Sequence, residues 1–318
     1  MPHKNSISVI IPNYNGRQLL EKYLPPCIAA LETEGIDYEI IVVDDASSDE
    51  SVDFIRKAYP LVSIMLQETN MGFSASCNLG ITAAKYDLVM LLNSDVALEK
   101  DYFGGLWKYF EDPMTFGVMG QILNSHGKTE DAARKLAFQG IKFKATRFYS
   151  PSKTTSWAPT AYLSGANALI DRKKLLELGG FNELYSPFYV EDVDLSFRAW
   201  RMDWRCYYDP KAICHHEVSA TTKSHHSKKK LYPILYRNKF ILQEIHLEGL
   251  ALQLWKVQLI LLEILPRILL GKWWILHAYQ LYRQQKPLIH ESKVQLIRKA
   301  RTKSIFEIKR RYFDPIKD

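Results

Sequence analysis

Cysteine is scarce in this chain of 318 residues, which contains only Cys27, Cys77, Cys206 and Cys214. The four lie far apart in the sequence and none forms a C-x-x-C pair, so we expect neither a disulfide framework nor a zinc or redox site made of cysteine pairs. The N-terminus lacks the long apolar stretch of a signal peptide, because the run at residues 7–11 is too short. We therefore interpret the cysteines as reduced thiols of a protein that begins in the cytosol.

The glycine-rich loops that bind phosphate in many enzymes are also missing. There is no G-x-G-x-x-G after the first apolar run and no G-x-x-x-x-G-K-[ST] anywhere, which argues against a dinucleotide oxidoreductase and a P-loop ATPase. Residues 216–220 begin like the H-E-x-x-H motif of zinc proteases, but Ala220 stands where the second histidine is required. A zinc protease is therefore not supported.

Charge is divided unevenly along the chain. With 47% hydrophobic and 24% charged residues, the composition is that of an ordinary globular protein and excludes intrinsic disorder and collagen-like repeats. Residues 1–222 hold 22 Lys and Arg against 28 Asp and Glu, a net charge of −6, whereas residues 223–318 hold 20 against 7, a net charge of +13. We therefore predict two regions, an acidic body over residues 1–225 and a basic region over residues 226–318.

The acidic body has the pattern of an α/β fold. Near-continuous Val, Ile and Leu runs alternate with helical patterns, which is typical of a mostly parallel, doubly wound sheet covered on both faces. Beyond about residue 115 the runs become mixed, and we expect a mixed sheet that completes the same domain. The expected strands are 7–11, 38–43, 62–66 and 87–92, the helices between them 17–31, 49–58 and 72–84, and the later segments 116–123, 136–149, 160–170 and a helix over 192–202.

From residue 231 the sequence becomes helical, and residues 250–270 are its most apolar part. Lys256, Glu263, Pro266 and Arg267 interrupt this stretch, so we expect no membrane span. Two interpretations remain open: a buried helical hairpin, or an interfacial helix that lies on a bilayer. The residues that favour the interfacial helix are Trp255, Lys272, Trp273, Trp274 and Arg283.

Acidic residues follow the predicted parallel strands directly. Asp44 and Asp45 come after the second strand and Asp95 after the fourth, and strands of a parallel sheet present their carboxyl ends at one edge, where ligands bind. Such a group of carboxylates is costly unless a cation joins it. Mg²⁺ or Mn²⁺ with a phosphorylated ligand meets this need. The alternative is that Asp44, Ser47, Ser48 and Asp49 are only helix caps and first-turn acids. We accept it for Asp49 and one of the serines, but it does not explain a doubled aspartate directly after a strand.

A second acidic group, Glu191, Asp192 and Asp194, stands where a helix should begin. These residues could be simple N-terminal acids that interact with the helix dipole. Asp192 and Asp194 do not face each other on a helix, so one should point toward a site and the other into packing or solvent. His216 could be a metal ligand, although a lone histidine is more often structural.

Seven short motifs occur in order along the acidic body. They read ISVIIPNYN (7–15), VVDDASSD (42–49), NMGF (70–73), LLNSDV (91–96), GGFNE (179–183), EDVDL (191–195) and HEVSAT (216–221). In this order they resemble family 2 glycosyltransferases of the GT-A fold, and more narrowly the rhamnosyltransferase-like branch of bacterial surface polysaccharide synthesis. The resemblance covers about residues 6–222.

The resemblance implies a role for each site residue. Asp192 would be the catalytic base, and Asp95, at the last position of a D-x-D-type motif that begins here with Asn93, would hold Mg²⁺ or Mn²⁺ against the donor diphosphate. His216 would be a further metal contact, although neighbouring His215 leaves the choice open. Asp45 would accept from the nucleobase. The other donor-binding residues would be Pro12 and Tyr14 around the base, Asp44 at the ribose, and Asn15, Asn70, Gly72, Asn78, Asn93, Ser94 and Glu191.

The implied activity is the inverting, metal-dependent transfer of one sugar from a nucleotide-diphosphate sugar, with dTDP-rhamnose and UDP-sugars as candidates. The acceptor would be a saccharide, in this branch often linked to a polyprenyl diphosphate. Residues 198–201 read RAWR, without the Q-x-x-R-W pattern of processive synthases, so we expect single additions. The basic C-terminal region would hold the protein on the anionic inner face of the cell membrane. The alternative is a catalytically degenerate sugar-nucleotide-binding or scaffold protein of polysaccharide assembly. Because the sequence contains no nucleic-acid-binding motif, we expect no nucleic-acid partner.

Overall fold

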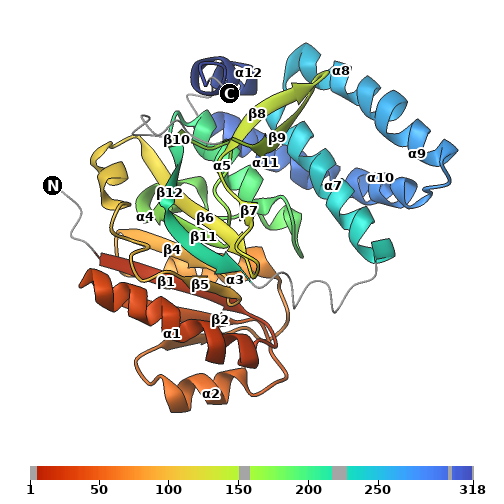
Figure 1. Cartoon of the computed structure of the whole chain (residues 1–318). Helices are drawn as coiled ribbons and strands as arrows, with labels where there is room; N and C mark the ends of the chain where they lie inside the picture. Colours follow the sequence, from red (N-terminus) through yellow and green to blue (C-terminus); the bar gives the residue numbers. More distant parts are fainter. Residues whose placement is uncertain (1–5, 150–157, 217–227, 300–302, 317–318) are drawn as a thin grey trace.

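Four parallel strands form the N-terminal half of the main sheet in the computed structural model, which describes residues 6–149, 158–216, 228–299 and 303–316 (Figure 1). Successive side chains face two different cores: Ile10 belongs to one, and Val9 and Ile11 belong to the other. This double burial explains the continuous apolar runs and confirms the predicted doubly wound arrangement. In spatial order the strands are β3 (Ser63–Leu66), β2 (Asp37–Asp44), β1 (Ser6–Asn13) and β4 (Leu88–Leu92); the helices between them are α1 (Arg17–Glu34), α2 (Ser51–Ala58) and α3 (Phe73–Ala83).

A mixed extension completes the sheet, as predicted. Strand β11 (Asn167–Asp171) is antiparallel to both β4 and β6 (Thr115–Asn124), and β12 (Arg205–His216) is parallel to β6. The end of β12 also pairs with β5 (Val96–Leu98), in a register that sets His216 opposite Val96. This pairing brings His216 next to Asp95, although 120 intervening residues separate them in the sequence. The sheet also contains β7 (Thr129–Asp131) and β10 (Ala158–Pro159).

The later part of the body differs from the expected segments in one respect. The run expected over residues 136–149 is a hairpin, β8 (Arg134–Gln139) and β9 (Lys142–Phe148), whose turn contains Gly140 at a positive φ of 63°. A glycine tolerates this left-handed conformation without steric cost, so the run reverses there. The remaining elements of the body are η1 (Trp107–Glu111), α4 (Arg172–Leu178), η2 (Glu183–Tyr185) and α5 (Glu191–Arg201).

The C-terminal helices share a core with the body. Ile241 and Ile245 on α7 (Lys228–His246) are buried in the same cluster as Ile10 and Phe197. The boundary expected at residues 225 and 226 lies outside the described residues, and the core continues across it. The elements after α7 are α8 (Gly249–Gln258), the π-helical η3 (Leu259–Ile264), α9 (Leu265–Leu269), α10 (Trp274–Gln284), α11 (Lys286–Lys299), α12 (Ile305–Ile308) and η4 (Lys309–Phe313).

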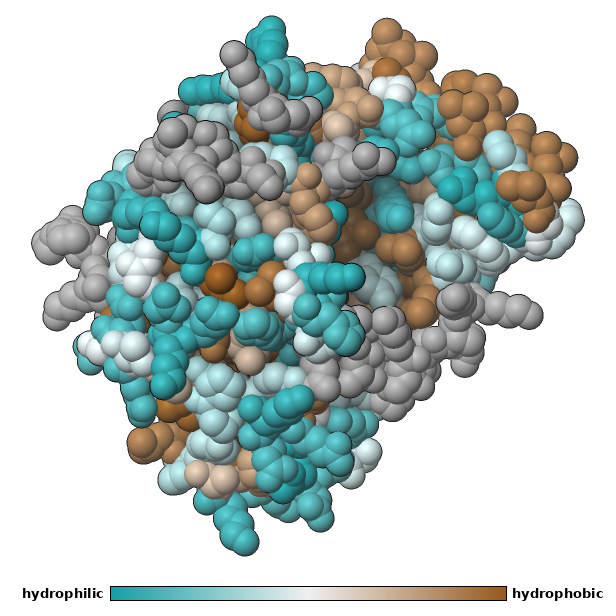
Figure 2. All heavy atoms as spheres, viewed as in Figure 1, coloured by the Kyte–Doolittle hydropathy of each residue, from teal (hydrophilic) through white to brown (hydrophobic). Residues whose placement is uncertain are grey.

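The helix from α8 through α9, Gly249–Leu269, has one packed side and one exposed apolar side. By length and composition alone, its 21 residues could cross a membrane, and only 17% of its most apolar window is buried, so its charges do not exclude a span as we had expected. Glu263 pairs with Lys142 and Arg267 on the packed side. The apolar surface gathers over α8 and α9 in Figure 2, and its most exposed members are Leu250, Leu254, Val257, Leu261, Leu262, Leu265 and Leu269.

The three tryptophans that favoured the interfacial interpretation are not all exposed. Trp255 is buried and contacts Tyr282 edge to face, and Trp274 stacks on Tyr232. Only Trp273 among these three is largely exposed, at 63%. The hairpin is therefore packed on one side, and a single tryptophan extends its exposed apolar side.

We predict that the C-terminal helices unfold together with the body. Ile241→Ala should lower the free energy of unfolding by about 2–5 kcal/mol, because the fully buried side chain leaves a cavity in the shared core. Leu261→Ala, a deletion at a leucine that is 53% exposed, should change it by less than about 0.5 kcal/mol. Urea unfolding followed by circular dichroism measures both. Equal effects of the two substitutions would contradict a shared core.

Candidate functional site

A cavity of about 610 Å³ opens at the carboxyl ends of β1, β2 and β4, where the sequence predicted a ligand site. Its volume is within the range of small-molecule sites. It is bounded on the opposite side by the N-terminus of α5 and the loop before it, residues 186–190. The predicted site residues that line it are Pro12, Tyr14, Asp45, Asn70, Gly72, Asn93, Ser94, Asp95, Glu191, Asp192 and His216.

Three predicted donor-binding residues are not among those that line the cavity: Asn15, Asp44 and Asn78. Asp44 is buried and accepts hydrogen bonds from Asn13 Nδ2 at 2.8 Å and from the Ser47 backbone N–H at 2.9 Å. Asn15 accepts from the Ser48 backbone N–H. These residues shape the loops at the strand ends.

Asn78 lies on α3 and holds a more distant loop. Its Oδ1 accepts from the Phe181 backbone N–H at 2.7 Å, and its Nδ2 donates to the Phe181 carbonyl and to Glu183. A side chain on Gly180 would collide with Asn78, since an added Cβ would lie 2.3 Å from its Oδ1. The G-G-F-N-E motif therefore forms a turn fastened to α3.

Asp45 lies at the cavity wall and organises the loop beside it. Its carboxylate accepts from the backbone N–H groups of Met71 and Gly72, at 2.7 and 2.8 Å, and from Gln67 Nε2 at 2.8 Å. Burial, and then the charge of Asp44, raise the pKa of Asp45, against the opposing effect of the backbone donors. Gly72 has φ of +86°, and an added Cβ there would lie 3.1 Å from the Pro187 carbonyl oxygen, so the residue must be glycine for the two loops to meet.

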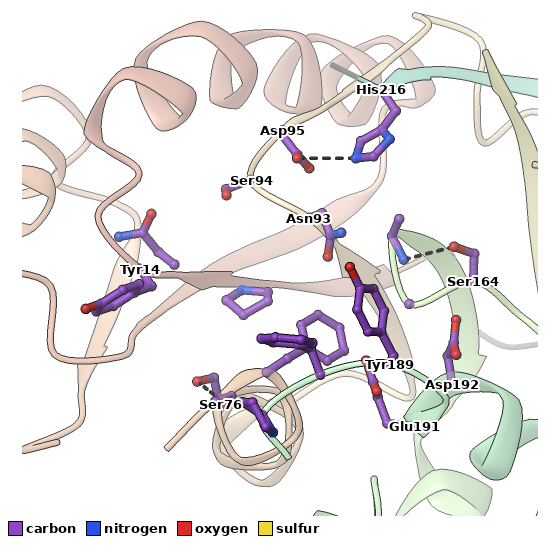
Figure 3. Close-up of a pocket in the computed structure, with 18 of the residues that line it drawn as sticks. Tyr14, Ser76, Asn93, Ser94, Asp95, Ser164, Tyr189, Glu191, Asp192 and His216 are labelled. Atoms are coloured by element: carbon purple, nitrogen blue, oxygen red, sulfur yellow. Dashed lines mark hydrogen bonds and ion pairs between the residues drawn. The ribbon is translucent and has the colours of Figure 1, made fainter. Parts of the chain in front are cut away.

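Asp95 and His216 form the polar pair of the cavity. Asp95 Oδ2 lies 3.2 Å from His216 Nε2 (Figure 3). The other ring nitrogen, Nδ1, lies 3.1 Å from Glu130 Oε2. Burial disfavours the charged imidazolium, but the hydrogen bond and charge of Asp95, together with Glu130, outweigh it and raise the pKa of His216 to about 9. In contrast, His215 pairs with Glu99 at 2.9 Å and does not line the cavity.

The spacing of Asp95 and His216 suits one hard divalent cation, which would take the place of the proton on the imidazolium ring. Two adjacent ligands of an octahedral ion, each about 2.1 Å from it, lie about 3 Å apart, close to the 3.2 Å between Asp95 Oδ2 and His216 Nε2. Within the described residues, no group of three or more His, Cys, Asp or Glu side chains could hold a metal ion. A cation here would need further oxygens from its ligand, as Mg²⁺ has at phosphate sites.

Glu191 and Asp192 face the cavity from the side opposite Asp95 and His216 (Figure 3). Burial, and then the charge of Asp192, raise the pKa of Glu191 to about 8. Burial and the charge of Asp131 raise the pKa of Asp192 to about 6, while backbone donors such as the Val193 N–H, 2.8 Å from its Oδ1, oppose this rise. Both shifts are upward, and Asp192 keeps the lower pKa of the two because backbone N–H groups donate to its carboxylate, so it is the more readily ionised of the pair.

Asp194 turns away from the cavity, as the spacing of the helix predicted. It is fully buried and accepts from Tyr185 Oη at 2.9 Å and Arg198 Nε at 2.7 Å. His246 on α7 contacts it at 3.0 Å. Of the two aspartates, Asp192 therefore lines the cavity and Asp194 is part of the packing.

Sequence reasoning missed one wall of the cavity, which comes from β7 and β8. Arg134 Nε donates to Asp131 Oδ1 at 2.9 Å, and Tyr162 Oη donates to Asp131 Oδ2 at 3.0 Å. Glu130 belongs to the same segment. No strand-end motif marked these residues, and only the closely spaced charges of residues 130–134 could have drawn attention to them. The aromatic residues Phe73, Phe188 and Tyr189 were missed as well.

The chain matches the sequence profile of glycosyl transferase family 2 over residues 8–179. It is 25% identical over 241 residues to N-acetylglucosaminyl-diphospho-decaprenol L-rhamnosyltransferase of Mycobacterium tuberculosis, a match that covers 68% of this chain and 77% of that protein. It is 37% identical over 95 residues to undecaprenyl-phosphate 4-deoxy-4-formamido-L-arabinose transferase of Edwardsiella ictaluri, which covers 28% of this chain and 29% of that protein. This transferase and two further curated relatives are matched over only 29 to 42% of their own lengths.

A solved structure shares the fold across nearly the whole chain. The mannosyltransferase PcManGT from Pyrobaculum calidifontis, in complex with GDP-Man and Mn²⁺, gives a TM-score of 0.53 at 16% identity, and the match covers 92% of this chain and 86% of that one. At this identity the likeness is one of fold, and it confirms the expected GT-A fold. Because the family profile also spans more than half of the sequence, including the strands that build the cavity, this chain belongs to glycosyl transferase family 2.

Proposed function

We propose that this protein is an inverting, metal-dependent glycosyltransferase that adds single sugars in bacterial cell-surface polysaccharide synthesis. Its donor would be a nucleotide-diphosphate sugar, with dTDP-rhamnose and UDP-sugars as the first candidates, and its acceptor a saccharide. One observation carries the proposal: the pair Asp95 and His216 faces Asp192 across one cavity. A group suited to a cation and a group suited to a proton therefore flank the space in which a donor would lie.

In the proposed reaction, Asp192 takes the proton of an acceptor hydroxyl as the acceptor oxygen bonds to the anomeric carbon. The bond from that carbon to the diphosphate breaks at the same time, and the nucleoside diphosphate leaves on the opposite face with inversion. Asp192 suits this role because its pKa of about 6 leaves it ionised yet basic at neutral pH. Burial and the charge of Asp192 raise the pKa of Glu191 beside it further, which disfavours a second negative charge next to the acceptor.

Asp95 and His216 would hold Mg²⁺ or Mn²⁺ together with the donor diphosphate. A bound divalent cation neutralises the negative charge that develops on a departing diphosphate, which is worth several kcal/mol. Mn²⁺ is present in the PcManGT complex, which supports this choice. Glu130 would orient the imidazole through His216 Nδ1, the arrangement usual for a ligating histidine.

The acceptor would be a saccharide carried by a polyprenyl diphosphate, as the name of the mycobacterial relative suggests. We propose that the exposed apolar side of α8 to α9 rests on the anionic inner leaflet, which makes the enzyme a peripheral protein of the cytoplasmic face. Two features support a lipid surface as the occupant. Leu269, at 87%, and Trp273, at 63%, are among the most exposed apolar residues, and the basic Lys272 beside them is exposed.

The second candidate is a catalytically degenerate protein that binds a sugar nucleotide without turnover. The raised pKa of Asp192 and its place in the cavity favour the enzyme. Hydrolysis of a donor in the presence of Mn²⁺ distinguishes the two, because only the enzyme releases the nucleoside diphosphate.

Replacing the proposed base should separate binding from chemistry. Asp192→Asn should lower the turnover of dTDP-rhamnose or a UDP-sugar by about 10²–10⁴-fold, the usual contribution of a general base, and leave donor affinity within about threefold. Nucleoside diphosphate release and calorimetric titration measure the two quantities. Asp53→Asn, at an exposed aspartate of α2, is the control and should change neither. Normal turnover by Asp192→Asn would refute the base assignment.

Two neighbouring histidines offer a matched test of the metal site. His216→Ala should weaken Mn²⁺ binding, measured by calorimetry in the presence of UDP or dTDP, by at least about tenfold, since loss of even a partner of a metal ligand has that effect. His215→Ala removes a histidine with a similar carboxylate partner outside the cavity and should leave Mn²⁺ affinity unchanged. Equal affinities in the two variants would exclude His216 as a ligand.

Charges on the exposed side of α8 to α9 should abolish membrane binding. We expect the wild-type chain to co-sediment with vesicles that contain anionic phospholipid, and the double variant Leu261→Asp, Leu265→Asp to remain in solution. Leu61→Asp, at a leucine of the body that is 96% exposed, should bind as the wild type does. The proposal would be wrong if the wild-type chain did not co-sediment with vesicles but formed a dimer that the double variant did not form. That result would assign this surface to contact with a second copy of the chain.

A further inference from the structure

The loop that carries the catalytic side of the cavity is conformationally strained. Residues 186–190 join η2 to α5, and within them Tyr189 and Val190 have φ values of 77° and 79°. Residues with side chains rarely adopt this left-handed region, and such a conformation persists only where the surrounding structure holds it. Tyr189 lines the cavity, and Glu191 and Asp192 follow directly. Something must therefore hold this loop in place.

Asn238 of α7 meets this loop from behind. It is fully buried, and its Nδ2 lies 2.7 Å from the Tyr185 carbonyl oxygen, 3.0 Å from that of Phe188 and 2.8 Å from that of Tyr189. Its Oδ1 accepts a hydrogen bond from Arg237 Nε at 2.8 Å. Because Nδ2 faces carbonyl oxygens and Oδ1 faces an N–H donor, these hydrogen bonds fit only one orientation of the amide group. Arg237 Nη2 donates in turn to the Ser186 carbonyl.

The same helix is fastened to α5 at a second point. Eight residues after Asn238, His246 contacts Asp194, two residues after Asp192 on α5. Asp194 is also bonded to Tyr185 and Arg198, so the end of η2 and the first turns of α5 are joined to α7. Helix α7 is therefore hydrogen-bonded both to the strained loop and to α5, the helix that carries Asp192.

We propose that Asn238 is a positioning residue for the transfer reaction: its amide holds the strained loop at residues 186–190 and thereby sets the place of Asp192. This inference rests on the proposed function only in so far as Asp192 is the base. It makes the C-terminal region part of the catalytic apparatus, because the group that orders the loop is supplied by α7.

Gln243 provides a control of the same chemical kind. It is a buried amide on α7 that bonds both backbone groups of one residue, accepting from the Phe143 N–H at 3.1 Å and donating to the Phe143 carbonyl at 2.8 Å. It fastens α7 to β9 and has no hydrogen bond to the catalytic loop among those of the described residues. Loss of either amide removes buried hydrogen bonds and should lower stability by a similar amount.

The test compares Asn238→Ala with Gln243→Ala in the full chain, both assayed well below their unfolding temperatures. Amide hydrogen exchange in the peptide that contains residues 186–192 should be at least about tenfold faster in Asn238→Ala and unchanged in Gln243→Ala. Turnover of dTDP-rhamnose or UDP-glucose with Mn²⁺ should show kcat lower by about 10²-fold in Asn238→Ala, the cost of misplacing a reacting group by about 1 Å, with KM for the donor within about threefold. Gln243→Ala should keep the wild-type kcat.

Two results would overturn the proposal: equal hydrogen exchange of this peptide in the two variants, or a wild-type kcat in Asn238→Ala. If Asn238→Ala does not fold, Asn238→Ser, which keeps a hydrogen-bond donor, replaces it with the same expected direction. The exchange measurement does not depend on turnover. A wild-type chain that turns over no donor would therefore refute the proposed function while the exchange data still decide whether Asn238 holds the loop.

Discussion

Carboxyl groups crowd one end of the sheet, and the arrangement around them depends on how each negative charge is compensated. A buried carboxylate is stable only with donors or a cation nearby. Asp44 and Asp45 accept hydrogen bonds from side chains and backbone N–H groups, and these bonds fix the loops after β2. Glu191 is buried, and this burial together with the charge of Asp192 raises its pKa and so favours its uncharged form. Among the described residues, Asp95 pairs with the imidazole of His216 alone, and Asp192 depends on backbone donors, so these two remain available for a ligand.

Basic residues of the C-terminal region form ion pairs with acidic residues of the body. Asp203 of the body pairs with Lys303 and Arg311, and Asp194 contacts His246. The charge division seen in the sequence therefore partly reflects contacts between the two regions rather than two separate partners. The exposed side of the helix from α8 to α9 is apolar, because Glu263 and Arg267 pair with each other on its packed side.

Much of the fold could be predicted from the sequence, because buried parallel strands leave continuous apolar runs and their ends leave motifs. The strand-end residues Asp45 and Asp95, and Asp192 at a helix start, were found in this way, and the structure brings all three to one cavity. The spacing on α5 also separated Asp192 from Asp194 correctly.

The remainder depends on contacts between segments far apart in the sequence, which leave no local pattern. Arg134 reaches the cavity only because β8 crosses beside it, and Asn238 acts on carbonyl groups about 50 residues before it. Asn78 was predicted to bind the donor, yet it hydrogen-bonds Phe181 and does not line the cavity. The sequence motif marked the neighbourhood of the site but could not tell which side chains face it.

Metal-assisted binding of a nucleotide-diphosphate sugar is the central claim, and a thermal-shift screen of such donors with and without Mn²⁺ tests it most directly. A donor that binds the folded chain raises its Tm in proportion to its affinity and concentration. We predict that at least one donor, dTDP-rhamnose or a UDP-sugar among them, raises the Tm, and that it does so more strongly with Mn²⁺ than without. A screen in which no nucleotide-diphosphate sugar changes the Tm under either condition would contradict the claim.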